Sequence, residues 1–246
     1  MRKPVIYIDI AKLSSEATMS SKSNLLDDLG TFLSLSQIDK AHHFASNTRV
    51  MEFLGVRKLL RDLLIRHADH LHLGELRLEQ DESGKPIITP VNHDLSVSLT
   101  HSRHWLGACF RYGLSVGMDL EERNRKMSDR LITRICTDEE LHHPEFKADK
   151  LRLWVIKEAI VKSMGRGLQA HLHLVNVSEL NRIEWDSQTE LIWGGCTFNV
   201  RKLAKEDQCF GFRAKYEHSD DYTGILLINK ELILAVAHSV INNDKN

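Results

Sequence analysis

Two pairs of charged side chains have the spacing of a site for a metal ion and phosphate groups. Asp119 and Glu121 end a segment that alternates like a strand, in which side chains two apart share a face, so both are predicted to project the same way. Glu158 and Lys162 lie on a helical segment, one turn apart on one side. Three carboxylates suit a hard divalent cation such as Mg²⁺, and the lysine adds a positive charge for a phosphate. The two segments together predict a magnesium and diphosphate site.

Taken separately, each pair has a plainer explanation. Asp119 and Glu121 could be ordinary acids at a strand end beside Arg123. Glu158 and Lys162 could be a solvent-exposed i,i+4 pair, which stabilises a helix by about 0.3 kcal/mol. Only their combination with further motifs favours a site.

Composition excludes several other classes. The 246 residues are 42% hydrophobic, enough for one large or two ordinary domains, and the formal net charge is -1. This balance gives no overall field for nucleic acid or a membrane surface, and no apolar run has the length of a signal peptide or a membrane span. The four cysteines show no CxxC spacing, as expected of reduced structural thiols. We therefore expect a cytoplasmic protein without nucleic-acid or membrane partners.

Hydrophobic periodicity predicts strands and helices in two similar series. In the first series the predicted strands are 5–10, 75–79, 95–99 and 105–111, and the helices are 25–35 and 47–68, with Asn47 as N-cap. In the second series the strands are 115–121, 171–177, 191–200, 208–216, 224–228 and 231–237, and the helices are 128–136, 138–142 and 149–165. A strand, then helices, then mostly antiparallel strands occur twice over, which predicts an α+β fold of two similar halves, residues 1–113 and 114–246. Each half is expected to pack a small sheet on a long helix, with a pseudo-twofold axis between them.

In combination and in this order, four motifs resemble the 4'-phosphopantetheinyl transferase superfamily, in its longer, surfactin-synthetase-activating type. They are Gly-Lys-Pro at 84–86, Val-Ser-Leu-Thr-His-Ser at 97–102, Gly-Met-Asp-Leu-Glu at 117–121, and the helical motif 154–162 followed by 165–168. The similarity spans roughly residues 36–170. Thr100 departs from the usual serine but keeps the hydroxyl, and His42 and His43 stand where the family is often rich in arginine.

The resemblance implies transfer of the 4'-phosphopantetheine arm of coenzyme A to a serine of an apo acyl or peptidyl carrier protein, with release of adenosine 3',5'-bisphosphate. It implies that Asp119, Glu121 and Glu158 hold Mg²⁺. Glu158 is expected to accept the proton of the serine, and Lys162 to stabilise the diphosphate and the leaving phosphate. Glu140 matches a family glutamate near the metal.

The resemblance also implies the contacts to coenzyme A, across a cleft between the halves. Lys40 and His101 would bind the 3'-phosphate, Lys85 and Arg77 would support the nucleotide, and Thr100 and Lys162 complete the coenzyme-binding residues. Plainer explanations stay open: Lys40 could be surface charge, Lys85 a turn lysine before proline, and His101 a strand-end histidine bonded to backbone.

Two clusters of basic side chains remain. Arg130 and Arg134 share one helical face and could dock an acidic carrier protein, or could be a solvated face. The histidines at 67, 70 and 72 lack cysteine partners and an HExxH motif, so helix-end histidines are a better explanation than zinc ligands.

Two other functions stay open beside the transferase. One is a non-catalytic module that binds coenzyme A or a carrier protein, and the other is a magnesium-dependent nucleotide diphosphate hydrolase. The four charged residues Asp119, Glu121, Glu158 and Lys162 argue against the first, because a pure binder does not need all of them. Because the chain contains both halves, a monomer is expected.

Overall fold

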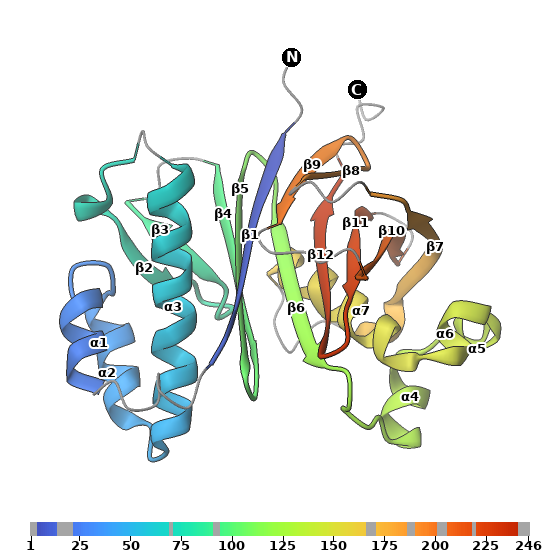
Figure 1. Ribbon diagram of the computed structural model, residues 1–246, viewed down its shortest axis with the longest axis horizontal. Helices are drawn as coiled ribbons and strands as arrows, with labels where there is room; N and C mark the ends of the chain where they lie inside the picture. The colour runs from blue at the N-terminus through green and yellow to red at the C-terminus, as the bar shows by residue number, and fades with distance from the viewer. Residues whose placement is uncertain are drawn as a thin grey trace.

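Two five-stranded sheets, each with one long helix against it, make up most of the structure (Figure 1). This computed structural model describes residues 4–13, 22–68, 71–90, 94–165, 171–185, 190–200, 206–217 and 220–240. The mixture of helices with mostly antiparallel sheets confirms the predicted α+β class. The pseudo-twofold relation between the halves stays a prediction.

The first sheet has the strand order β4-β5-β1-β9-β8. Its strands are β1 (Val5–Lys12), β4 (Leu95–Ser102), β5 (Trp105–Tyr112), β8 (Glu190–Trp193) and β9 (Cys196–Val200). The central strand β1 pairs antiparallel with β5 and parallel with β9. Because β8 and β9 come from late in the chain, residues 1–113 and 114–246 do not correspond one to one to the two sheets.

The second sheet is an antiparallel array in the order β6-β12-β11-β10-β7. Its strands are β6 (Val116–Glu122), β7 (Val175–Ile183), β10 (Gln208–Tyr216), β11 (Asp220–Ile228) and β12 (Leu232–Ser239). Alternate residues of β12 belong to two different cores, as the period of two along a strand requires. Ile233, Ala235 and Ala237 pack with the long helix of this half, and Leu232, Leu234 and Val236 pack with residues of the first sheet.

The outer face of the first sheet is covered by α3 (Asn47–His67), with α1 (Lys22–Leu29), α2 (Leu35–His43) and a hairpin of β2 (Arg77–Gln80) and β3 (Pro86–Thr89) beside it (Figure 1). The long helix is predicted well, although its N-cap is Ser46 rather than Asn47. The single helix predicted over 25–35 is wrong, since α1 and α2 are separated by a turn at Gly30.

In the second half, β6 leads through three short helices to the long helix α7 (Lys150–Met164). The short helices are α4 (Asp129–Ile135), α5 (Asp138–His142) and α6 (Pro144–Ala148). The side chains of Ser128, Thr137 and Asp149 cap the N-termini of α4, α5 and α7, which explains why the chain starts a new helix at each. None of the helices in the described parts of the chain is long and apolar enough to cross a membrane.

Two strand predictions in the second half differ from the structure. The segment predicted as one strand over 191–200 is the β8–β9 hairpin, because Gly194 and Gly195 adopt positive φ angles of 55° and 80° and form its turn. The segment predicted as a strand over 171–177 begins with a 3₁₀ turn, Leu172–Leu174, before β7 starts. Residues 14–21, His70 and residues 166–168 of the glycine motif lie outside the described residues.

Candidate active site

The acidic end of β6 lies directly against α7. Asp119 and Glu121 alternate along β6 on the same face as Gly117. A Cβ atom at Gly117 would lie 2.0 Å from the carbonyl oxygen of Ala159 and 2.3 Å from the backbone nitrogen of Ser163, so only glycine permits this approach. The close contact brings the carboxylates of β6 beside the side chains that α7 presents.

Lys162 of α7 joins the two halves of the molecule. Its Nζ donates to Asp119 Oδ1 at 2.6 Å and to Thr100 Oγ1 at 3.2 Å, and Thr100 Oγ1 donates to Asp119 Oδ1 at 3.1 Å. The other carboxylate oxygen of Asp119, Oδ2, is buried and has no hydrogen-bond partner among the residues that the structure describes. A buried anionic oxygen without a donor is costly, so it is a place where a cation would be stabilised.

Glu158 lies within electrostatic reach of the same carboxylate. Burial raises its pKa above the ordinary glutamate value and the negative charge of Asp119 raises it further, while Lys162 and Arg125 oppose the change. A divalent cation between Glu158 and Asp119 would remove this repulsion. These two residues therefore fit the predicted metal site.

Glu121, the third predicted ligand, has other partners in this structure. It forms an ion pair with Arg125 and accepts a hydrogen bond of 2.7 Å from Ser102 Oγ. The guanidinium of Arg125 also lies over the ring of Trp154, 4.9 Å from its centroid. In the described parts of the chain no three or more His, Cys, Asp or Glu side chains are arranged as a ready metal site. The three-carboxylate ligand set stays a prediction.

A row of hydroxyl groups on β4 connects the edge of the first sheet to β6. The row consists of alternate residues of the strand, Ser96, Ser98, Thr100 and Ser102. The first two accept the backbone N–H groups of Val116 and Met118, each at 3.0 Å. The last two donate to the carboxylates of Asp119 and Glu121. The hydroxyl row therefore fixes the acidic end of β6 against the first sheet.

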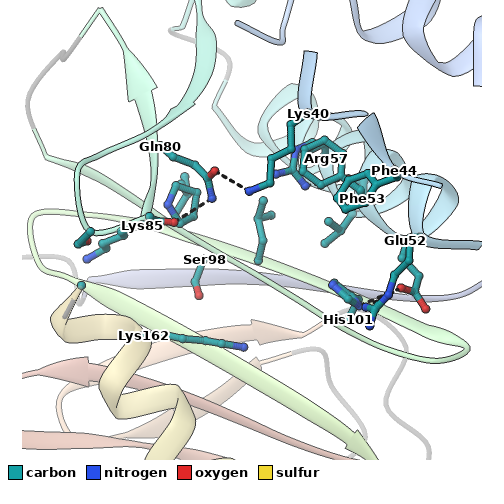
Figure 2. A pocket seen from close by; sticks show the side chains of 18 residues that line it. Lys40, Phe44, Glu52, Phe53, Arg57, Gln80, Lys85, Ser98, His101 and Lys162 are labelled. Carbon is teal, nitrogen blue, oxygen red and sulfur yellow. Dashed lines mark hydrogen bonds and ion pairs between the residues drawn. The ribbon is translucent and has the colours of Figure 1, made fainter. Parts of the chain in front are cut away.

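Residues 97–99 and 101 of β4 line a cavity of about 400 Å³ between the sheet, α3, the β2–β3 turn and the end of α7 (Figure 2). Of the residues predicted to bind coenzyme A, Lys40, Lys85, His101 and Lys162 line it. Lys40 donates to Gln80 Oε1 at 3.1 Å, and Lys85 donates to the carbonyl of Ser163 at 2.9 Å. Burial lowers the pKa of Lys85. A cavity with several cations and few anions suits a ligand that carries phosphate groups.

Arg77 and Thr100 lie elsewhere. Arg77 donates to the carbonyls of Gly74 and Leu76 and is not among the described residues that line the cavity. Thr100 faces Asp119 on the other side of β4 from His101. The structure therefore gives Arg77 no contact that supports a nucleotide, whereas Thr100 lies at the carboxylate cluster.

The sequence prediction missed one helix face that lines the cavity, formed by Arg49, Glu52, Phe53 and Arg57 of α3. Arg57 donates to Gln37 Oε1 at 2.9 and 2.7 Å and lies 3.2 Å from the centroid of the Phe53 ring. Burial lowers its pKa to about 9, so it stays charged at neutral pH. The spacing of three and four residues on α3 was the available signal, because such residues share a helix face.

A second, more polar cavity of about 770 Å³ adjoins the first. The two share Arg49, Glu52 and His101, and the second is also lined by Glu121 and Arg125. The shared residues connect the cationic cavity to the carboxylate cluster, so one extended ligand could reach both.

The remaining predicted residues lie apart from this site. Both oxygens of Glu140 are used by protein donors: Oε2 accepts from Lys157 and the backbone of Thr137, and Oε1 accepts from the backbone of Val177. Glu140 therefore has a structural role in a buried ion pair and a capping box. Its match to a family glutamate near the metal gains no support from these contacts.

The two basic clusters have different settings. Arg130 and Arg134 of α4 are exposed, as docking requires, while the neighbouring Met127 and Leu131 are partly buried against the core of this half. His67 stacks on Tyr7, with 4.5 Å between ring centroids. No zinc-like cluster is present around the histidines that the structure describes.

Comparison with known proteins gives one family. A family model described as the 4'-phosphopantetheinyl transferase superfamily matches residues 115–219, which include Asp119, Glu121, Glu158 and Lys162. A Bacillus subtilis protein described as 4'-phosphopantetheinyl transferase ffp is 28% identical over 182 residues, covering 70% of this chain and 74% of its own length. A second Bacillus subtilis protein, described as 4'-phosphopantetheinyl transferase, is 29% identical over 131 residues, covering 49% of this chain and 57% of its own. These matches confirm the resemblance predicted from the sequence.

Proposed function

From the similarity of this chain to the 4'-phosphopantetheinyl transferase superfamily, we infer that it transfers the phosphopantetheine arm of coenzyme A to a serine of an apo carrier protein. The other product is adenosine 3',5'-bisphosphate. The observation that carries this conclusion is the cluster of Asp119, Glu158 and Lys162 beside a cationic cavity.

The transfer exchanges one phosphorus–oxygen bond for another. The serine oxygen of the carrier forms a bond to the β-phosphorus of the diphosphate while the bond from that phosphorus to the bridging oxygen breaks. Glu158 is proposed to accept the serine proton, and its raised pKa, which makes it a stronger base once it is ionised, supports this role. Lys162 supplies positive charge where the leaving phosphate gains negative charge.

Magnesium is part of the proposal. The residues that would hold it are Asp119, Glu121 and Glu158. This is supported by Oδ2 of Asp119, which no described residue bonds, and by the repulsion that raises the pKa of Glu158. When bound, Mg²⁺ polarises the diphosphate and offsets the charge of the leaving group. Lys162 and Thr100 keep Asp119 in place at the end of β6.

The cavity would take the nucleotide part of coenzyme A. Lys40 and His101 are proposed to bind the 3'-phosphate and Lys85 the nucleotide, and the newly found Arg57 adds a buried charge to the same wall. Arg77 has no part in this arrangement, because its guanidinium bonds backbone carbonyls of its own segment.

The wider setting belongs to the same proposal. Exposed Arg130 and Arg134 offer an acidic carrier protein a cationic docking surface, and the presence of both halves in one chain supports action as a monomer. A cytoplasmic location is supported by the four cysteines, which are all free and buried, as expected where thiols stay reduced.

Intact-protein mass spectrometry tests the activity directly. Apo carrier proteins are incubated with coenzyme A, Mg²⁺ and the protein, its Glu158→Gln variant, or Glu75→Gln as a matched change at an exposed glutamate. We expect the phosphopantetheine mass on the carrier with the wild type and with Glu75→Gln, and a rate about 10²- to 10⁴-fold lower with Glu158→Gln.

The same experiment separates the two alternative functions. A non-catalytic module would bind coenzyme A without modifying any carrier. A nucleotide diphosphate hydrolase would release adenosine 3',5'-bisphosphate when no carrier is present.

A further inference from the structure

One carboxylate stands among the cations of the cavity. The described residues that line this cavity include five cations and one acid, Glu52. The cations are Lys40, Arg49, Arg57, Lys85 and Lys162. Glu52 is 6% exposed. A buried negative charge would repel a phosphate group, so its presence in this wall calls for a compensating role.

Glu52 faces His101 across the junction of the two cavities (Figure 2). Its Oε2 lies 3.6 Å from His101 Nδ1 and 3.3 Å from the guanidinium of Arg49, whose side chain is exposed. Glu52 belongs to α3 and His101 to β4, so this contact links the helix to the sheet. With Nδ1 turned to the carboxylate, the other ring nitrogen, Nε2, is left for a ligand.

We infer that Glu52 is a positioning residue that orients His101 and holds it as an imidazolium when a phosphate monoester binds, which gives the cavity its preference for such ligands. The inference rests on the proposed function, in which this cavity takes the 3'-phosphate of coenzyme A.

The chemistry of the imidazole explains why a carboxylate is useful at this place. A neutral ring has one N–H donor, whereas the imidazolium has two. With Glu52 on one side and a phosphate on the other, both N–H groups meet an anion and the proton is stabilised from both sides. A ligand without the phosphate gains nothing from this arrangement.

The charges around His101 decide the direction of the effect. Burial lowers its pKa, Glu52 raises it, and Lys162 of α7 with Arg49 and Arg57 of α3 lower it. Removing the charge of Glu52 leaves burial and the three cations unopposed, so the pKa of His101 should fall. The ligand-free variant would then keep His101 neutral to a lower pH than the wild type does.

The test compares wild type, Glu52→Gln and Asp62→Asn, which removes one acid from α3 at a site where it pairs with Lys58 and Arg61. Calorimetry measures the affinity for coenzyme A and for dephospho-coenzyme A, which lacks the 3'-phosphate, from about pH 5.5 to about pH 8. Nitrogen-15 NMR follows the titration of His101 in the ligand-free protein. A preserved spectrum shows that each variant is folded.

For Glu52→Gln we expect His101 to titrate at lower pH and the preference for coenzyme A over dephospho-coenzyme A to fall about three- to tenfold near pH 7, since tenfold corresponds to one pKa unit. Toward the acid end the difference from the wild type should shrink, because more of His101 is then protonated in both proteins, and a general structural defect would not produce this trend. Asp62→Asn should change neither quantity. In a His101→Gln background, Glu52→Gln should have no further effect on the preference.

Two results would overturn the inference: an unchanged His101 titration in Glu52→Gln, or a lowered titration with an unchanged ligand preference at every pH. Failure of the wild type to bind coenzyme A would instead refute the proposed function. Because the titration is measured without ligand, it decides whether Glu52 and His101 are coupled in either case.

Discussion

At the scale of single residues, the position of Glu158 suits its proposed chemistry but lowers the stability of the folded protein. Glu158 is buried close to Asp119, and both effects raise its pKa. The folded protein therefore keeps the proton of Glu158 to a higher pH than the unfolded chain does. Between the ordinary glutamate pKa and the raised value the folded state binds more protons, so stability falls as pH rises through this range.

Replacing Glu158 by glutamine should remove this cost. In metal-free buffer at about pH 8, Glu158→Gln is expected to unfold at a higher temperature than the wild type, because no charge is then buried beside Asp119. The difference should disappear as pH falls below the ordinary glutamate range, where both side chains are neutral. Thermal unfolding followed by circular dichroism over this range checks the prediction, with Glu75→Gln as the control.

An equal or lower melting temperature for Glu158→Gln at about pH 8 would contradict the repulsion between the two carboxylates. A constant offset at every pH would point to packing rather than charge.

The sequence could predict the reactive residues better than their neighbours. The alternation of Asp119 with Glu121 and the four-residue spacing of Glu158 and Lys162 are local patterns, so they were visible without a structure. The approach of Glu52 to His101 joins two distant segments, and no local spacing reports it.

At the scale of secondary structure, the contact of β6 with α7 brings these residues together, and it leaves no room for a side chain at Gly117. Gly117→Ala should destabilise the protein by about 1–3 kcal/mol or more, because the new methyl group would overlap the α7 backbone. The shift of α7 should also weaken the Lys162–Asp119 contact and lower transfer activity. Urea unfolding and the mass-spectrometric assay measure the two effects. Gly74→Ala is the control and should change stability little, because among the described residues no atom beyond those of its two chain neighbours lies within 4 Å of the added carbon.

A buried ion pair between Lys157 of α7 and Glu140 of α5 connects the two helices, and Glu140 also accepts a hydrogen bond from the backbone of β7. Lys157 is 0% exposed and donates to Glu140 at 2.7 Å and to the carbonyl of Ile135 at 2.6 Å. Lys157→Met should cost about 3–5 kcal/mol in the free energy of unfolding, because the buried carboxylate of Glu140 loses its partner. Chemical denaturation checks this value.

A surface pair provides the comparison for this buried one. Arg213→Ala breaks an exposed ion pair with Glu179 and should cost less than about 1 kcal/mol. The double variant Lys157→Met/Glu140→Gln should recover part of the loss, since no isolated charge then remains. A similar loss for Lys157→Met and Arg213→Ala would show that the buried pair has no special weight.

Helices and strands with a clear local pattern in the sequence could be predicted, whereas two turns inside apolar segments could not. The capped helix Asp138–His142 and the strand Gln208–Tyr216 were predicted with the observed bounds. The β8–β9 hairpin was missed because Gly194-Gly195 was taken as part of one apolar strand. The turn that separates α1 from α2 was missed because the hydrophobic pattern continues across Gly30.

At the scale of the whole molecule, the β8–β9 hairpin ties late sequence to the first sheet. The register pairs Val5 with Thr197 and Ile8 with Val200. No periodicity in the sequence indicates a parallel pairing over this separation, so the predicted division at residue 113 followed the order of elements along the chain alone. The shared core of both sheets also crosses this division.

A fragment of residues 114–246 tests how far the halves are independent. Without β1, the β8–β9 hairpin lacks its neighbour and the apolar face shared by the sheets is exposed. We expect the fragment to bind a hydrophobic dye and to unfold without a cooperative transition, whereas the full chain shows one transition by both circular dichroism and tryptophan fluorescence. A cooperative transition of the isolated fragment would support two separate domains.

The place of β1 in the first sheet has a consequence for synthesis on the ribosome. Its partner β5 is made early, but β9 follows only after helices α4 to α7 of the second half. Until then the second edge of β1 is open, and an open strand edge can pair with other chains. A translational pause between β5 and β9 would therefore prolong the exposure of this edge, whereas the same pause after β9 would not.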